Sequence, residues 1–355
     1  MAIYLLIFFT LMLLRFALQG QPRLRDQVYY LVLAFLFAFS AFRFQVGCDW
    51  WGYIAQWNAQ EARGNLPSPD QREPLWWAGI ALLQAIGLPY PWLNVTSNAL
   101  FFVGIHAIAR RQPDPLGFLV LLFPILIINM PMSGIRQGAA IGVLCFAFLA
   151  FMDRRAIRFA ALVFIASLIH ESSIVLLLML PLVKGDYSRQ RLFLAVLLAL
   201  PGAFVLAQGD ASQTASTRYI GTGLDAGGAI FRVSLLSMTG LGYFLFARRR
   251  WRAEFPQDFK LVTISALILS VLILIVPLST VIGDRLGYYF IPLQTIIFAR
   301  LPYLRLGPSR PILIVAPYLA LTLIFLAWTS LSELFFICYT PYQTWILGLP
   351  AFTTF

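Results

Sequence analysis

Long apolar runs separated by short polar junctions follow one another along the whole chain. Most of them approach the ~20 residues that a membrane-spanning helix needs, and an α-helix satisfies its own backbone hydrogen bonds in lipid. The pattern therefore predicts an all-α polytopic integral membrane protein with about 11 spanning helices. We expect residues 1–355 to form a single integral membrane domain.

Several segments interrupt this regularity. Residues 75–88 are apolar but too short to span, which predicts a re-entrant or short helix. The polar stretches 45–73, 208–229 and 279–285 are predicted to be loops on one side of the membrane. The two apolar runs on either side of His170 are short, and this favours broken or tilted helices.

Composition supports a membrane protein and excludes a soluble domain. Hydrophobic residues make up 60% and charged residues 12% of the chain, against about 25% charged residues in a soluble protein. The net charge of +11 therefore reflects loop topology, and we expect no nucleic-acid partner. Cys48, Cys145 and Cys338 have no metal-ligand spacing, and nothing in the sequence pairs Cys48 with Cys338.

Basic residues gather at alternate junctions and so predict the orientation. Six clusters hold 19 of the 26 basic residues and are cytoplasmic by the positive-inside rule. The clusters are Arg15/Arg23/Arg25, Arg110/Arg111, Arg154/Arg155/Arg158, Lys184/Arg189/Arg191, Arg248/Arg249/Arg250/Arg252/Lys260 and Arg300/Arg305/Arg310. This assignment places the N-terminus and the three polar loops outside.

The remaining basic residues are all arginines, and they fall on the outer side. They are Arg43, Arg63, Arg72, Arg136, Arg218, Arg232 and Arg285. A charge within a membrane segment costs about 2.5–3.5 kcal/mol and usually faces a cavity or a partner. Because the planar guanidinium binds phosphate oxygens in pairs, we expect an outward-facing cavity for a polyprenyl phosphate or diphosphate. No nucleotide-binding or zinc motif is visible, so neither a cofactor nor a metal is expected.

The segment Asn129 to Gln137, reading NMPMSGIRQ, is the centre of this prediction. Ser133 and Arg136 lie there at a helix start, where backbone N–H groups and the helix dipole favour an anion. His170 would supply acid–base chemistry beside it. Two simpler interpretations stay open, because Arg136 could snorkel to the membrane surface and His170 could be an interfacial histidine.

Four short motifs appear in order over residues 40–180. They are Phe42-Arg43-Phe44 with Val46-Gly47-Cys48-Asp49-Trp50 and Tyr53, then Glu73-Pro74-Leu75, Ser133-Gly134-Ile135-Arg136-Gln137, and Leu168-Ile169-His170-Glu171-Ser172-Ser173. In these motifs the chain resembles the EpsG family of bacterial exopolysaccharide proteins, which are grouped with the Wzy-type repeat-unit polymerases. Cys48 stands where a hydroxyl residue is expected, and Trp50 where Tyr is usual.

The resemblance implies a multi-pass polymerase of the bacterial inner membrane with its active site on the periplasmic face. It would transfer a growing glycan from undecaprenyl diphosphate to the next lipid-linked repeat unit, without metal or nucleotide. A chain-length regulator, or polysaccharide co-polymerase, is an expected partner. The expected site comprises His170 and Asp49 as catalytic residues, Arg136, Arg218, Arg285 and Arg43 for the diphosphate, and Glu73, Gln137, Ser133, Tyr53 and Trp50 for the substrate.

Three other functions compete with polymerisation. A flippase for the same lipid-linked glycan would need arginines along both halves of a pathway, whereas the informative charges here lie only outside. A glycosyltransferase using a polyprenyl-phosphate sugar would use an Asp in its first outer loop, which Asp49 could supply. A membrane acyltransferase with His170 as its base is the least favoured.

Overall fold

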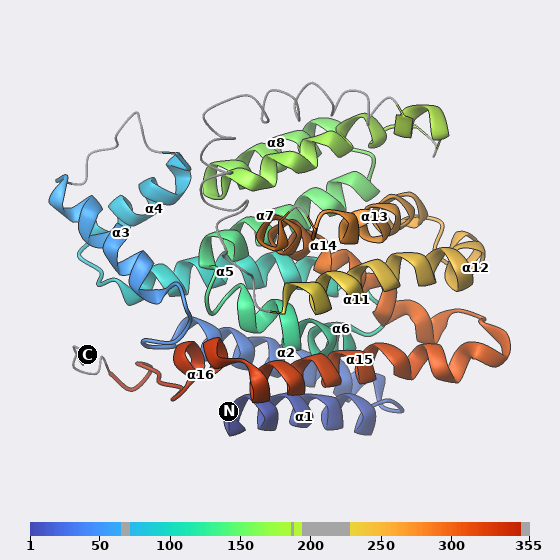
Figure 1. The fold of residues 1–355 in the computed structure, drawn as a ribbon, viewed down its shortest axis with the longest axis horizontal. Coiled ribbons are helices and arrows are strands. Elements are labelled where there is room, and N and C mark those ends of the chain that lie inside the picture. The colour runs from blue at the N-terminus through green and yellow to red at the C-terminus, as the bar shows by residue number, and fades with distance from the viewer. Residues whose placement is uncertain (65–71, 186–187, 194–227, 278, 349–355) are drawn as a thin grey trace. The chain divides into compact units, whose positions relative to one another are not determined.

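The computed structural model describes residues 1–64, 72–185, 188–193, 228–277 and 279–348 (Figure 1). These residues form two compact units. Unit 1 contains Met1–Val143, Ile165–Glu171 and Leu321–Phe355, and unit 2 contains Leu144–Phe164 and Ser172–Ala320. The expectation of one integral membrane domain stays a prediction.

Every regular element in the described ranges is a helix. Unit 1 contains α1 (Ala2–Ala17), α2 (Pro22–Ala41), α3 (Trp50–Ala62), α4 (Pro74–Ala85), α5 (Pro91–Ala109), α6 (Pro115–Leu122), the π-helix η1 (Phe123–Ile127) and α16 (Glu333–Tyr339). Residues of both units contribute to α7 (Ile135–Met152), α8 (Ala156–Ile169) and α15 (Arg310–Leu331). Unit 2 contains η2 (Glu171–Leu182, from Ser172 on), α11 (Ala229–Gly242), η3 (Tyr243–Ala247), α12 (Arg248–Glu254), α13 (Phe259–Val271), η4 (Leu272–Leu274), α14 (Thr280–Arg300), η5 (Leu301–Tyr303) and η6 (Gly307–Ser309).

Within the described part of the chain, five helices are long and apolar enough to cross a membrane. They are α2, α5, α7, the continuous helix Ala229–Glu254 and α15. The all-helical, multi-pass character predicted from the sequence is therefore confirmed. The total of about 11 spans and the outward-facing cavity stay predictions.

Proline sets the start of several helices in unit 1. Pro22, Pro74, Pro91 and Pro115 each occupy the first turn of a helix. Proline fits there because its fixed φ suits the helix and its missing N–H would have had no intrahelical acceptor. Before α6, the Asp114 carboxylate also accepts the Gly117 backbone N–H at 2.9 Å.

Two glycines bring α5 and α7 together in unit 1. A Cβ atom on Gly104 would lie 2.0 Å from the Gly142 carbonyl oxygen, and one on Gly142 would lie 2.2 Å from that of Leu100. Small residues allow backbones in a membrane to approach this closely. The contact fixes α7 against α5 and thereby positions the residues at the start of α7.

The structure corrects two of the three predicted loops. The stretch 45–73, which was predicted to be an outer loop, contains a helix, α3, because Trp50, Tyr53 and Trp57 recur at helical spacing and are buried on one face. The predicted turn 279–285 is helical from Thr280 onwards, since the Ser279 hydroxyl caps α14 by accepting the Ile282 N–H. The predicted loop 208–229 lies almost entirely outside the described residues.

The α-helix is interrupted at His170, as the short apolar runs on either side of this residue predicted. Helix α8 ends at Ile169, and the 3₁₀ helix η2 starts at Glu171. Residues 75–88 contain α4, a helix of 12 residues, which is shorter than a spanning helix. Whether α4 is re-entrant stays a prediction.

The end of the chain returns to the segment between α2 and α3. Cys338 forms a disulfide with Cys48, a pairing that no feature of the sequence predicts. Beyond it, Thr344 and Arg43 form an antiparallel bridge, and the Tyr342 ring stacks on Phe39 at 4.5 Å between centroids. The expectation of unpaired cysteines is wrong because these contacts bring together two segments distant in sequence.

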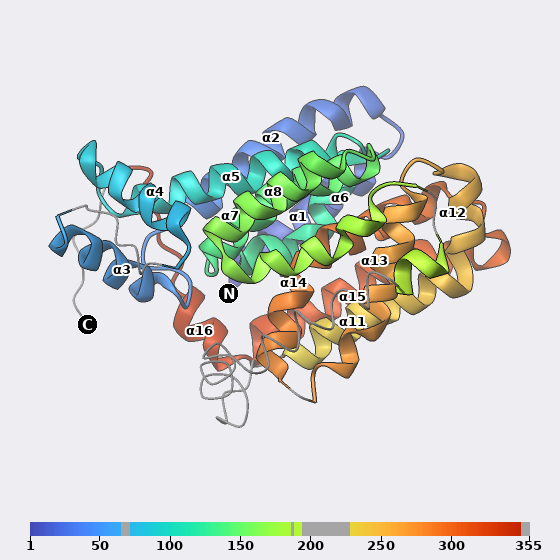
Figure 2. The ribbon, with the colours of Figure 1, turned by 90° about the horizontal axis from the view of Figure 1, so that it is seen from above.

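Helices α11, α13 and α14 pack against one another in unit 2 (Figure 2). Gly240 allows α11 and α13 to approach, since a Cβ there would lie 2.4 Å from the Ala266 carbonyl oxygen. The Tyr243 and Thr263 hydroxyls are hydrogen-bonded at 2.8 Å in the same interface. Unit 2 therefore has its own packed core.

Candidate active site

The carboxylate of Glu73 is the centre of a charged cluster in unit 1. Its Oε1 accepts the Nδ1–H of His170 at 2.8 Å and the backbone N–H of Glu171 at 3.0 Å. Its Oε2 forms an ion pair with Nη1 of Arg136. Glu73 and His170 are 8% and 14% exposed in their side chains, so these bonds are largely shielded from water.

Backbone geometry at three breaks delivers these side chains. Glu73 has φ 63° and ψ 60°, a left-handed conformation that is rare outside glycine, directly before Pro74 at the start of α4. His170 lies at the break between α8 and η2, and Arg136 in the first turn of α7. Strained backbone of this kind costs about 1–3 kcal/mol and is concentrated at functional sites.

Electrostatics hold Glu73 in its charged form. Burial, the largest single influence, raises the pKa of Glu73, but the hydrogen bond from His170 and the positive charge of Arg136 together outweigh it. The net effect is a pKa below the ordinary value of 4.5. At neutral pH Glu73 is therefore a carboxylate that accepts hydrogen bonds from both neighbours.

Tyr53 supports Arg136 from α3. The Arg136 guanidinium lies 5.8 Å from the centroid of the Tyr53 ring, and the Tyr53 hydroxyl accepts the Arg136 backbone N–H at 3.5 Å. The Arg136 side chain remains 29% exposed, and its buried Nε lacks a hydrogen-bond partner in the described structure. The guanidinium thus keeps donor capacity for another group.

A second polar pair joins the start of α3 to the segment before α7. The Ser133 hydroxyl donates to the Asp49 carboxylate at 3.3 Å. Gly47 has φ +103°, and a Cβ on it would lie 1.8 Å from the Met132 carbonyl oxygen. Only glycine allows this approach, which together with the neighbouring Cys48 disulfide places Asp49 beside Ser133.

A profile of the EpsG family matches residues 27–344, which is most of the chain. The chain belongs to the EpsG family. This family is associated with polysaccharide polymerisation. No curated protein and no solved structure matches the chain.

The structure brings together most of the residues that the EpsG motifs predicted in unit 1. Each of the four motifs supplies at least one member to the two contact sets. Glu73, His170, Arg136 and Tyr53 form the first set, and Asp49 with Ser133 forms the second. Glu73, which was expected to position sugar, contacts His170 and Arg136 in this EpsG-family chain, and its role toward sugar stays a prediction.

Arg43 is placed differently from the expected diphosphate ligand. Its side chain is fully buried, and it donates to the carbonyl oxygens of Val46 at 2.9 Å and Ser40 at 3.0 Å. Burial lowers the pKa of Arg43, but the carbonyls and the Trp50 ring at 5.7 Å compensate the charge. In this arrangement Arg43 holds the segment between α2 and α3 together and has no surface open to a ligand.

Trp50 and Gln137 are also buried among protein atoms. The Trp50 ring contacts Tyr90 edge to face at 5.0 Å, and Tyr90 donates its hydroxyl proton to the Trp50 carbonyl at 3.1 Å. Gln137 is 6% exposed. The neighbouring Trp51 is 54% exposed, so the accessible tryptophan in this EpsG motif is one position later than predicted.

Unit 2 contains a charged pair that the sequence reasoning missed. Arg232, one of the seven arginines predicted to lie on the outer side, binds Asp284 through two hydrogen bonds of 2.8 and 2.7 Å. The pair sits beside Tyr288, whose ring centroid lies 5.8 Å from the Arg232 guanidinium. Arg285 is exposed on α14, and its convergence with Arg136 stays a prediction. The expected ligand Arg218 lies outside the described residues.

In the part of the chain that the structure describes, no three His, Cys, Asp or Glu side chains gather closely enough to hold a metal ion.

Proposed function

We propose that this EpsG-family protein polymerises lipid-linked repeat units at the outer face of the bacterial inner membrane. The growing glycan leaves undecaprenyl diphosphate and is joined to a sugar hydroxyl of the next lipid-linked unit. The observation that carries the proposal is the buried hydrogen bond between His170 and Glu73, formed next to Arg136. This arrangement brings together a base, His170, the carboxylate that orients it, Glu73, and a cation that can bind an anion, Arg136.

His170 is the proposed general base. An imidazole that donates Nδ1–H to a carboxylate carries its lone pair on Nε2, in the tautomer suited to accept a proton. The acceptor hydroxyl gives its proton to Nε2, and its oxygen forms the new bond to the anomeric carbon. The bond from that carbon to the diphosphate oxygen breaks, and its electron pair leaves with the diphosphate. Glu73 stabilises the imidazolium that forms.

Arg136 is the proposed ligand for the diphosphate. Its ion pair with Glu73 is made through Nη1, and the 29% exposed guanidinium carries further N–H donors. Guanidinium–phosphate bonds are charge-assisted and strengthen as negative charge develops on the leaving group. The position of Arg136 in the first turn of α7 adds the favourable helix dipole.

Asp49, Ser133 and Trp51 are proposed to position the acceptor sugar. Asp49 is exposed and fixed by Ser133, so its carboxylate suits binding of sugar hydroxyls. The exposed Trp51 ring offers an apolar face for a sugar ring. Asp49 is the second candidate for the base, and it lacks the buried carboxylate partner that His170 has.

The outer location is supported by the disulfide. Disulfides persist in oxidising compartments such as the periplasm and are rare in the cytosol. Cys48 directly precedes Asp49, so the disulfide supports an outer location for the site, in agreement with the positive-inside rule. A chain-length regulator is part of the proposal as a partner, as are Arg218 and Arg285 as further diphosphate ligands.

The test is polymerisation by the purified protein in detergent. A lipid-linked repeat unit should give a ladder of products of increasing length without added nucleotide. A substrate shown to be competent with another polymerase, yet giving no ladder here, would contradict the proposal. If the reconstituted protein instead moves the unextended lipid across a vesicle bilayer, the flippase alternative is correct. Transfer of one sugar from a polyprenyl monophosphate donor would identify the glycosyltransferase alternative.

A further inference from the structure

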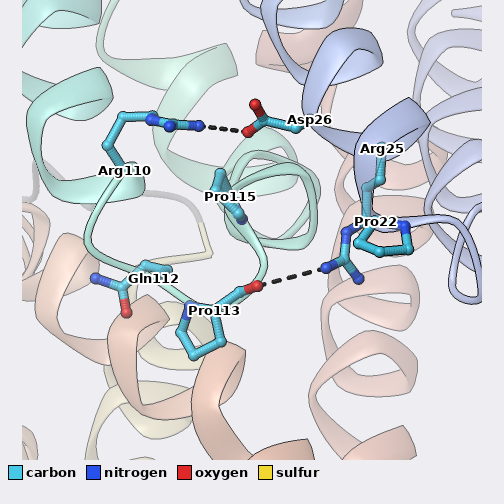
Figure 3. Close-up of a pocket in the computed structure, with 7 residues that line it drawn as sticks. All are labelled: Pro22, Arg25, Asp26, Arg110, Gln112, Pro113 and Pro115. Atoms are coloured by element: carbon cyan, nitrogen blue, oxygen red, sulfur yellow. Dashed lines mark hydrogen bonds and ion pairs between the residues drawn. The ribbon is translucent and has the colours of Figure 1, made fainter.

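Unit 1 contains a cavity of about 300 Å³ far from the Glu73 cluster. It lies between the N-terminal end of α2 and the segment that joins α5 to α6 (Figure 3). Pro22 and Pro115 form part of its wall, and Arg25, Asp26 and Arg110 supply its charged groups. Helix α2 has 20 residues, so about 30 Å separates this end from Arg43.

Two guanidinium groups border this cavity. Arg110 forms an ion pair with Asp26, and both side chains are substantially exposed, at 40% and 48%. Arg25 is 15% exposed and lies 3.6 Å from the buried Asp114 carboxylate, with a 3.5 Å hydrogen bond to the Pro113 carbonyl. The exposed Asp26 carboxylate is thus an anion already bound to Arg110, one of the two arginines. The cavity has room for a larger anion.

The surface next to the cavity indicates what kind of anion would bind. The Tyr30 ring on α2 is 46% exposed, and its centroid lies 5.5 Å from the Arg110 guanidinium. Tyrosine rings are enriched where a membrane meets water, at the level of the lipid headgroups. A phosphate in the cavity would therefore lie beside an interfacial aromatic ring, as the headgroup of a phospholipid does.

Basic residues around the cavity indicate the leaflet. Arg23 and Arg111 flank the lining residues in the sequence, and both belong to clusters that the positive-inside rule places in the cytoplasm. Basic pockets between membrane helices on that side suit the phosphates of anionic lipids. We propose that this cavity binds the phosphate headgroup of an anionic phospholipid of the cytoplasmic leaflet, with Arg110 and Arg25 as donors and Asp26 as a competing carboxylate.

Native mass spectrometry of the purified protein tests this site without any turnover assay. Phosphatidylglycerol should bind more tightly than phosphatidylethanolamine. Arg110→Gln should weaken phosphatidylglycerol binding roughly fivefold, the effect of one basic residue near an anionic surface. Arg23→Gln is the matched control, because Arg23 is exposed and does not line the cavity, and the phosphatidylglycerol affinity of this variant should match that of wild type.

Asp26→Asn gives the sharpest test because its expected sign is opposite. Removing the carboxylate releases Arg110, so phosphatidylglycerol should bind several-fold more tightly. Equal affinity for the two lipids, or an unchanged affinity in Arg110→Gln, would overturn the proposal. Displacement of the lipid by millimolar inorganic phosphate would assign the cavity to a free anion and overturn the lipid source. Because binding is measured directly, failure here is distinct from failure of the proposed polymerase.

Discussion

Replacing Glu73 with Gln tests the centre of the candidate site. The amide has nearly the shape of the carboxylate but no charge, and its nitrogen cannot accept a hydrogen bond. One of two interactions must therefore be lost, either the 2.8 Å bond from His170 or the ion pair with Arg136. Whichever is kept becomes a bond to a neutral group.

The structure sets the size of the expected effects. A hydrogen bond to a charged group contributes about 1.5–3 kcal/mol, so the free energy of unfolding should fall by about that amount. A positioned base accelerates proton transfer by roughly 10²–10⁴-fold, and without its carboxylate His170 loses the preferred tautomer. Glu73→Gln should therefore lower turnover by about 10²–10⁴-fold, with a smaller change in KM.

The assay is the rate of ladder formation from a purified lipid-linked repeat unit, measured at several substrate concentrations. Glu171→Gln is the matched control, since Glu171 is adjacent to His170 in the sequence. Its carboxylate is 61% exposed and forms a 3.8 Å ion pair with Arg72. This variant should polymerise within about threefold of wild type, as expected for an exposed pair. A folded Glu73→Gln protein with wild-type turnover, or an equal loss in Glu171→Gln, would refute the role given to Glu73.

Three further predictions follow from unit 1. Replacing Cys48 and Cys338 with Ser should lower stability by about 2–4 kcal/mol, the usual effect of losing a disulfide, and reduce turnover. Gly47→Ala should also lower stability and turnover, because residue 47 has a positive φ and its Cβ would contact the Met132 carbonyl. The strained backbone should lower stability by about 1–3 kcal/mol. Because the pKa of Glu73 is lower in the folded protein, its stabilising effect is full above pH 4.5 and is lost as pH falls through the lowered pKa.

Thermal unfolding checks all three, each with its own control. Cys145→Ala keeps the disulfide, so its mobility on a non-reducing gel should match wild type. Gly52→Ala is a fair partner for Gly47→Ala, since a Cβ on Gly52 meets open space. As the pH falls, Glu73→Gln should lose less stability than wild type does. An unchanged pH profile in that variant would argue against a lowered pKa of Glu73.

The all-helical architecture could be predicted because few backbone structures are stable in lipid. Apolar runs that must satisfy their own backbone hydrogen bonds become helices, and the break at His170 followed from the short runs around it. Arg136 and His170 could be selected for the same reason, since a charge or an imidazole at a helix end within a membrane is costly without a partner.

Contacts between distant segments could not be predicted. Trp50 and Trp51 are identical in type and adjacent, and only the packing of α3 against Tyr90 decides which one is buried. In the sequence Arg43 is no different from the other outer-side arginines. Its partners in the structure are backbone carbonyl oxygens, which the pattern of side chains does not predict. Glu73 was selected by its motif, yet its bond to His170 joins residues 97 positions apart.

The disulfide also constrains how the chain is threaded through the bilayer. A covalent bond between two side chains requires both to emerge on the same side, so the chain must cross the membrane an even number of times between residues 48 and 338. Helix α4 lies inside that interval. If α4 crossed the bilayer, the number of other segments that cross between the two cysteines would therefore have to be odd, and if α4 did not cross, that number would have to be even.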